Sequence, residues 1–148
     1  MTLERYRRQL PHWSQEGGFY FVTFRLKASL LNPTEVAFVR DYISEFPNAF
    51  ILAIVVMSDH VHLILRPHDT EALSTDMKGI KGSSARRLNF RRRTIGTVWQ
   101  HESFDRIIRS EDELREKLNY MLMNPVRAGI ANDPWKYAGW YLNEKSSQ

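Results

Sequence analysis

Short apolar runs along the chain predict four strands. They are rich in aromatic and β-branched residues and are bounded by glycine or polar positions. The runs are GFYFVTFRL at 18–26, AFILAIVVM at 49–57, SDHVHLILRP at 58–67 and a fourth around 105–109. The second is apolar throughout, which is typical of a strand covered on both faces. Ser58 and Asp59 are polar turn formers, so the second and third strands are expected to pair as a hairpin.

A first helix is predicted between the first two strands. Asn32 suits the capping position and Pro33 the first helical position, while Glu35 can bond back to the amide of the cap. After the cap, apolar residues recur at helical spacing, at Val36, Val39, Ile43 and Phe46. Pro47 ends this helix.

Two further helices follow the hairpin. One is expected to begin at Thr70 and to run through a basic stretch, with an interruption or an end near Gly79 or Gly82. The last begins at Ser110, with Glu113 placed three residues later for a second capping box. Its apolar stripe consists of Leu114, Leu118, Met121 and Leu122.

The order of these elements is β-α-β-β-α-β-α, which predicts an α+β fold of the ferredoxin-like split βαβ type with one additional helix. We expect an antiparallel sheet with helices on one face and the additional helix at the C-terminal end. A chain of 148 residues without repeats or a linker-like segment fits a single domain over residues 1–148.

Composition narrows the possible functions. The absence of cysteine excludes disulfides and thiolate chemistry, and the N-terminus lacks the apolar region of a signal peptide, so a soluble cytoplasmic protein is expected. The net charge is +4, and no acidic residue occurs from Met77 to Gln100. That stretch contains Lys78, Lys81, Arg86, Arg87, Arg91, Arg92 and Arg93. It fits either a nucleic-acid-binding surface or a solvated helix face.

Two histidines occupy an unusual place in the third strand. Alternate side chains of a strand share a face, so His60 and His62 project together with Ile64. Both imidazoles can converge on one metal ion, although ordinary hydrogen-bonded polar positions would also explain them. A third ligand would favour the metal site.

The last predicted helix offers a candidate for that ligand. Tyr120 and Asn124 are four residues apart and share a face of the helix. Pro125 disfavours helical geometry at Asn124, which places this amide in the final turn. Two imidazoles and an amide oxygen would suit Mg²⁺ or Mn²⁺ with open positions for substrate oxygens. A core tyrosine and a helix-end asparagine are the alternative interpretation.

Several segments together resemble one known family. They are PHWSQEGGFYFVTFRL, VVMSDHVHLILRP, KGSSARRLN and VWQHESFDRIIRSEDELREKLNYMLMNPVRAGI, which extend over nearly the whole chain. They are similar to the REP-associated tyrosine transposases, relatives of the single-tyrosine HUH insertion-sequence transposases. Ser58 and Asp59 stand where many members have Pro and Asn, and Asn124 stands where the insertion-sequence relatives usually have Gln.

The resemblance implies that Tyr120 is a nucleophile and that His60, His62 and Asn124 hold a divalent metal ion at the scissile phosphate. A phenol is mostly protonated at neutral pH, so a nearby cation would favour the phenolate. The implied products are a 5′-phosphotyrosine and a free 3′-hydroxyl. The implied substrate is single-stranded DNA beside short imperfect hairpins, the repetitive extragenic palindromes (REPs).

The sequence also offers residues for binding that DNA. Basic side chains can follow the phosphate backbone, and exposed aromatic rings can stack on unpaired bases. The candidates for the first role are Lys78, Lys81, Arg86 and Arg87, and those for the second are Trp99, Trp13, Phe19 and Phe21, although each ring also fits a hydrophobic core. A non-cleaving nucleic-acid-binding regulator and a hydrolase in which Tyr120 orients water are alternatives, and the oligomeric state, monomer or homodimer, stays open.

Overall fold

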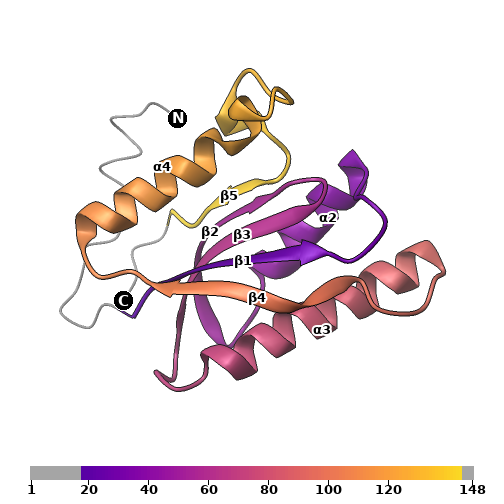
Figure 1. Cartoon of the computed structure of the whole chain (residues 1–148), viewed down its shortest axis with the longest axis horizontal. Helices are drawn as coiled ribbons and strands as arrows, with labels where there is room; N and C mark the ends of the chain where they lie inside the picture. Colours follow the sequence, from indigo (N-terminus) through magenta and orange to yellow (C-terminus); the bar gives the residue numbers. More distant parts are fainter. Residues whose placement is uncertain (1–17, 145–148) are drawn as a thin grey trace.

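The computed structural model describes residues 18–144 and contains a five-stranded antiparallel sheet (Figure 1). The strands are β1 (Tyr20–Leu26), β2 (Ala49–Val56), β3 (His60–Pro67), β4 (Trp99–Ile107) and β5 (Trp140–Leu142). Their order across the sheet is β4-β1-β3-β2-β5. The predicted α+β class, the ferredoxin-like order and the hairpin between β2 and β3 are confirmed.

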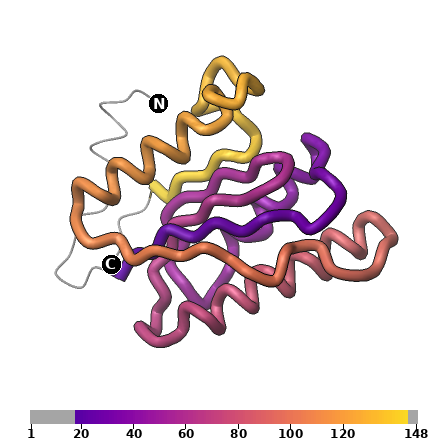
Figure 2. The backbone as a smooth tube through the Cα atoms, in the orientation of Figure 1, coloured from indigo at the N-terminus to yellow at the C-terminus, as the bar shows by residue number. Residues whose placement is uncertain are grey.

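Helices lie on both faces of the sheet, as the backbone tube in Figure 2 shows. The helices α2 (Pro33–Ser44) and α3 (Leu73–Arg92) cover one face, and α4 (Glu111–Arg127) covers the other. Each face has its own apolar core because successive strand residues point in opposite directions. Val61, Leu63 and Leu65 pack toward α2 and α3, whereas Ile64 packs toward α4 with Leu118 and Met121.

Helix α3 is continuous, so the expected break near Gly79 or Gly82 is wrong. Both glycines lie inside the helix, which reaches Arg92. A glycine in a helix interior costs roughly 1 kcal/mol relative to alanine. The burial of Met77, Ile80 and Leu88 against the sheet offsets this cost. Gly79 also allows a close approach, since a Cβ there would lie 3.3 Å from the ring of Phe46.

Strand β4 begins earlier than predicted. It starts at Trp99 and ends at Ile107, whereas a strand around 105–109 was expected. Only its first residue is buried, because β4 is an edge strand, and its sequence therefore lacks a clear apolar pattern. The pairing with β1 shifts between Phe24 and Leu26, where Gln100–Glu102 bulge outward.

The segment after α4 adds a short helical turn and a fifth strand, which the sequence analysis did not predict. The 3-10 turn η1 (Pro134–Lys136) leads into β5, which pairs with β2. Gly139 passes so close to β2 that an added Cβ would lie 2.2 Å from the carbonyl oxygen of Val56. Any side chain at this position would push β5 away from the sheet.

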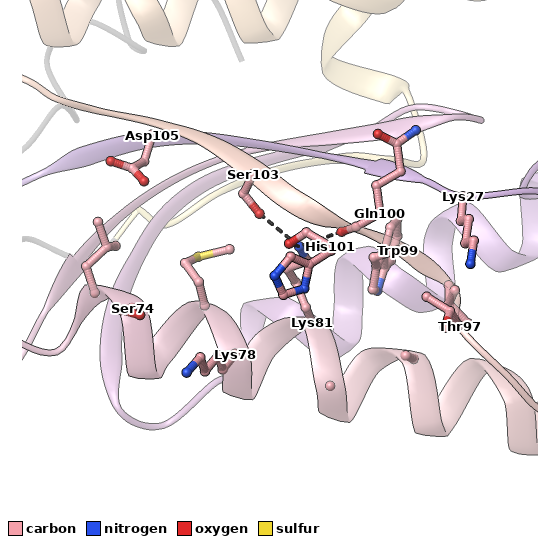
Figure 3. A pocket seen from close by; sticks show the side chains of 15 residues that line it. Lys27, Ser74, Lys78, Lys81, Thr97, Trp99, Gln100, His101, Ser103 and Asp105 are labelled. Carbon is pink, nitrogen blue, oxygen red and sulfur yellow. Dashed lines mark hydrogen bonds between the residues drawn. The ribbon is translucent and has the colours of Figure 1, made fainter.

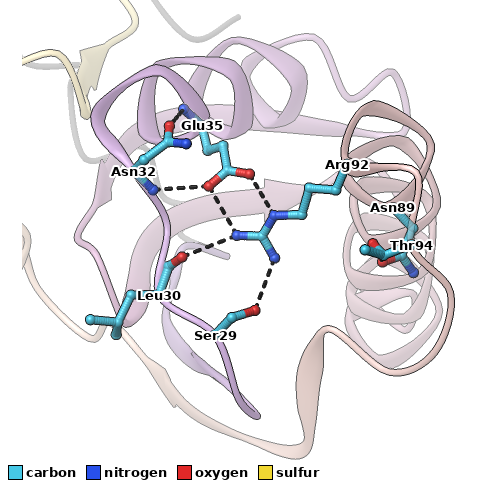
Figure 4. A network of polar contacts seen from close by, with 7 residues as sticks. All are labelled: Ser29, Leu30, Asn32, Glu35, Asn89, Arg92 and Thr94. Carbon is cyan, nitrogen blue, oxygen red and sulfur yellow. Dashed lines mark hydrogen bonds and ion pairs between the residues drawn. The ribbon is translucent and has the colours of Figure 1, made fainter.

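The predicted helix caps are largely confirmed. Asn32 and Glu35 form the reciprocal capping box of α2. The carboxylate of Glu35 also accepts from Arg92, which ties the end of α3 to the start of α2 (Figure 4). Ser110 caps α4, but Glu113 does not bond back to it because its carboxylate accepts from Arg106.

No helix within residues 18–144 combines the length and the apolar character needed to cross a membrane.

Candidate functional site

The two histidines of β3 lie side by side on the face that α4 covers. Their ring centroids are 4.7 Å apart, and the His62 ring stacks on Phe21 of β1 at 5.3 Å. His62 is buried and His60 is partly exposed. The expectation that both imidazoles project from one face together with Ile64 is therefore confirmed, and α4 covers that face.

Each imidazole is held through its Nδ1 atom. The Asp59 carboxylate lies 2.7 Å from Nδ1 of His60, and the hydroxyl of Thr23 lies 2.7 Å from Nδ1 of His62. Histidines that bind a metal commonly have the second ring nitrogen fixed in this way. The arrangement leaves Nε2 of both rings as the atom that faces a ligand. The hydrogen bond to His60 holds the pKa of Asp59 below its usual value.

His62 is neutral over a wide pH range. Burial, together with the smaller effects of the positive charges of His60, Arg25, Arg127 and Lys117, lowers its pKa to about 3. A neutral imidazole is the form that binds a metal.

This shift predicts acid sensitivity of the metal-free protein. The unfolded chain takes up a proton at His62 below pH 6.5, whereas the folded chain does so only near pH 3, so stability falls as the pH drops through this window. At pH 4.5 the loss from His62 amounts to roughly 3 kcal/mol. Urea unfolding in EDTA at pH 7 and pH 4.5 should therefore show a smaller pH effect for His62→Gln than for the unchanged protein. Equal pH effects would contradict the assignment.

Tyr120 stands next to this pair. Its ring centroid is 5.6 Å from that of His62, and the side chain is 46% exposed, so the phenol is accessible to a substrate. The guanidinium of Arg127 lies 4.4 Å from the ring centroid and also donates to the carbonyl oxygen of Tyr120. Tyr120 is therefore held on the surface of α4 and does not belong to the core.

Asn124 follows Tyr120 by one turn of α4 and is partly exposed. The expected departure from helical geometry at Asn124 is wrong, because α4 continues through Pro125 to Arg127. Pro125 only removes one backbone donor, and the sheet-facing apolar residues hold the helix across that gap. Asn124 does lie in the last turn, as predicted.

The surroundings of the histidines are electropositive. The positive charges of Arg25 on β1 and of Lys117 and Arg127 on α4 help to lower the pKa of His62. The ammonium of Lys117 lies 5.1 Å from the ring centroid of Phe21, and Arg25 is paired in register with His60. Such a cluster of cations favours an anionic substrate. In residues 18–144 no group of three or more His, Cys, Asp or Glu side chains is placed to hold a metal.

The basic residues predicted to bind DNA lie along α3, on the other face of the sheet. Lys78, Arg86 and Arg87 are exposed. Lys81 instead donates to the carbonyl oxygens of Gln100 and His101, and burial lowers its pKa. It therefore fastens the bulge of β4 to α3.

A groove of about 970 Å³ separates α3 from β4 (Figure 3). Its walls carry Lys27, Lys78 and Lys81, and its floor includes Met77 and Trp99. The side chains of Ser103 and Asp105 also line the groove.

The aromatic residues predicted to stack on bases are core residues wherever the structure describes them. Trp99 is 4% exposed, packs against Phe24 and donates from Nε1 to the hydroxyl of Ser84. Phe19 and Phe21 are also buried. The burial of these three rings does not support the stacking role expected of them. Trp13 lies outside the described residues.

Two residues that fix the site were not predicted. Thr23 reaches His62 because the register pairs these two residues across β1 and β3. Asp59 was interpreted as a turn residue, yet it also orients its neighbour His60. The sequence signal that could have indicated this role is the acidic residue directly before the first histidine.

The fold and this site define a class of protein. Residues 26–112 match the family model described as transposase IS200-like, so the chain belongs to that family. The match includes His60, His62 and α3 and ends before Tyr120.

The particular relatives agree with the resemblance found in the sequence. A Haemophilus influenzae protein assigned as a REP-associated tyrosine transposase is 24% identical over 166 aligned residues, covering 97% of this chain and 89% of the relative. The structure of a REP-associated tyrosine transposase bound to a REP hairpin matches with a TM-score of 0.65 and 20% identity, covering 88% of this chain and 89% of the other. A Deinococcus radiodurans protein assigned as a transposase matches with a TM-score of 0.54 and 20% identity, covering 72% of this chain and 88% of the other.

Proposed function

We propose that this transposase-family protein cleaves and rejoins single-stranded DNA next to REP-type hairpins through a covalent 5′-phosphotyrosine at Tyr120. The observation that carries the proposal is the position of Tyr120, an accessible phenol whose ring lies 5.6 Å from that of His62. A binding protein would not need a tyrosine there, and a hydrolase in which Tyr120 orients water would form no covalent adduct. The fold shared with a hairpin-bound REP-associated transposase supports the choice of substrate.

The residues present fit a divalent metal ion such as Mg²⁺ or Mn²⁺. His60 and His62 are each fixed at Nδ1, and the pKa of His62, at about 3, keeps that imidazole neutral. Together with the Asn124 amide, the two imidazoles would supply nitrogen and oxygen ligands. When bound, the metal would withdraw charge from the scissile phosphate and favour the phenolate.

The protein's own residues perform the remaining steps. Arg127 orients the Tyr120 ring, and Arg25 and Lys117 attract the phosphodiester. The phenol oxygen forms a bond to phosphorus and releases its proton to solvent, while the bond from phosphorus to the 3′ oxygen breaks and that oxygen takes up a proton. Because the new phosphotyrosine ester replaces the broken phosphodiester, a 3′-hydroxyl can reverse the step and rejoin strands without ATP. The cytoplasm is the compartment expected for this activity.

A second part of the proposal is that α3 binds the DNA backbone. Of the seven basic residues between Met77 and Gln100, Lys81 and Arg92 are engaged by protein oxygens, and Arg91 packs over the Phe38 ring. The seventh, Arg93, lies just past the end of α3, and the exposed Lys78, Arg86 and Arg87 on the helix remain available to phosphates.

This part predicts a specific salt dependence. Each phosphate contact on single-stranded DNA contributes about −0.7 to the slope of log K against log salt. Replacing Lys78, Arg86 and Arg87 by Gln should therefore make the slope less negative by about 2. The control Lys136→Gln, an exposed cation on η1, should leave the slope unchanged. An unchanged slope in the triple variant would remove α3 from the interface.

The decisive experiment for the proposed function is incubation of the protein with a labelled single strand that carries a REP-type hairpin, in the presence of Mn²⁺. The expected product is a protein–DNA adduct that survives a denaturing gel and maps by mass spectrometry to Tyr120. Cleavage without an adduct would indicate a hydrolase, and binding without cleavage would indicate a regulator.

A further inference from the structure

Strand β4 presents an exposed aromatic ring on the same face of the sheet as the histidines. Phe104 is 59% exposed. In the strand register Phe104 lies opposite Thr23, and Thr23 lies opposite His62. Residues directly opposite each other on antiparallel strands project to the same face. Phe104, Thr23 and His62 therefore form a row across three neighbouring strands.

The contacts of its neighbours confirm the direction in which Phe104 projects. Arg106, two residues further along β4, bonds to Glu113 of α4 and so lies on the α4 face. Ser103 and Asp105 line the groove beside α3 and so lie on the opposite face (Figure 3). Phe104 alternates with these two residues and shares the face of Arg106.

Helix α4 leaves this part of the sheet open. Its buried residues pack over β2, β3 and β5 with Leu52, Ile64 and Trp140, while every residue of β4 after Trp99 is exposed. An exposed phenylalanine on a sheet edge gains nothing from burial and invites unwanted pairing with other chains. Its position calls for a partner that covers the ring.

The charges around the ring identify that partner. Arg25 projects from β1 on the same face, in register with His60, and is exposed. Lys117 lies over the Phe21 ring of β1, and Arg127 lies over the Tyr120 ring beside the histidines. An aromatic ring beside several cations suits a nucleobase with its phosphates, because every base offers a flat face and the backbone is anionic. Adjacent strands are about 4.8 Å apart, so Phe104 is about 10 Å from His62 along the row, which is within reach of one nucleotide.

We propose that Phe104 is the stacking platform for an unpaired base of single-stranded DNA directly beside the phosphate that Tyr120 attacks. This inference rests on the proposed function, since it places the scissile phosphate at His62. Stacking fixes the base and so sets which bond of a flexible strand lies under the phenol. Arg25 holds the phosphate between the stacked base and the histidines.

The test uses fluorescence of the DNA itself. Tyr120→Phe protein is mixed with hairpin oligonucleotides that carry 2-aminopurine at successive positions of the single-stranded flank, so that no cleavage is required. Quenching is expected at one or two positions next to the bond that unchanged protein cleaves. Adding Phe104→Ala should abolish that quenching and weaken binding roughly tenfold, whereas Phe104→Trp should retain both.

The control is Ile95→Ala in the same Tyr120→Phe background. Ile95 is 98% exposed, lies between α3 and β4, and belongs neither to the catalytic face nor to the residues of α3 proposed to bind phosphates, so quenching should be unchanged. Quenching that persists in Phe104→Ala would overturn the inference. So would a change in mass by light scattering from dimer to monomer in Phe104→Ala, because it would assign the ring to an interface between two copies.

The outcome separates this inference from the proposed chemistry. If the unchanged protein forms no covalent adduct but the quenching depends on Phe104, base stacking on Phe104 is supported and the proposed cleavage through Tyr120 is contradicted. If the adduct forms but the quenching does not depend on Phe104, cleavage through Tyr120 is supported and base stacking on Phe104 is contradicted.

Discussion

Replacing Tyr120 by Phe should eliminate the covalent protein–DNA adduct and all strand cleavage, while hairpin binding stays within about twofold, since only one exposed hydroxyl is lost. The substitution removes the oxygen that attacks phosphorus and nothing else. The ring contact with Arg127 and the hydrogen bond from Arg127 to the backbone carbonyl are both retained. A denaturing gel with labelled DNA measures the adduct, and a gel-shift assay measures binding.

The matched control for this variant is Tyr42→Phe. Tyr42 lies on α2, on the far side of the sheet, and stacks on Phe38. The Tyr42→Phe variant should form as much adduct as the unchanged protein. Residual adduct in Tyr120→Phe that maps to another residue would assign the nucleophile elsewhere.

Replacing His60 by Ala should remove metal-dependent cleavage and weaken Mn²⁺ binding to the protein–DNA complex at least about 100-fold, because losing a ligand costs no less than losing a residue that supports one. His60 is partly exposed, so the variant should fold normally. Electron paramagnetic resonance of Mn²⁺ reports binding independently of activity. The exposed His68, changed to Ala in the same way, serves as the control.

Two further measurements sharpen this prediction. Asp59→Ala should weaken Mn²⁺ binding about 10- to 100-fold, because it frees the ring of His60 without removing it. Mn²⁺ should also bind more tightly with DNA than without it, since the positive charges of Arg25, Lys117 and Arg127 oppose the metal until a phosphate offsets them. Undiminished binding of Mn²⁺ by His60→Ala would remove this histidine from the ligand set.

Much of the fold was predictable because its signals are local. The capping box of Asn32 and Glu35, the turn at Ser58 and Asp59 and the cap of Ser110 each depend on residues a few positions apart. The histidine pair was predictable for a similar reason, since the two-residue period of a strand fixes the common face.

The missed features depend on contacts between distant segments. The continuity of α3 depends on how Gly79 and Ile80 pack against the sheet and α2, which propensity alone does not show. Strand β4 depends on pairing with β1 and has almost no buried side chain to reveal it. The burial of Trp99 and the bond from Thr23 to His62 both follow from the register of strands far apart in sequence.

The last strand has a consequence for synthesis of the protein. Helix α4 carries Tyr120, but part of the apolar core that holds α4 on the sheet comes from Trp140 of β5, assisted by Trp135. Part of the packing that holds Tyr120 in place is thus synthesised after Tyr120 itself. A nascent or shortened chain without β5 already has the histidine strand but lacks part of the packing that seats Tyr120 beside it.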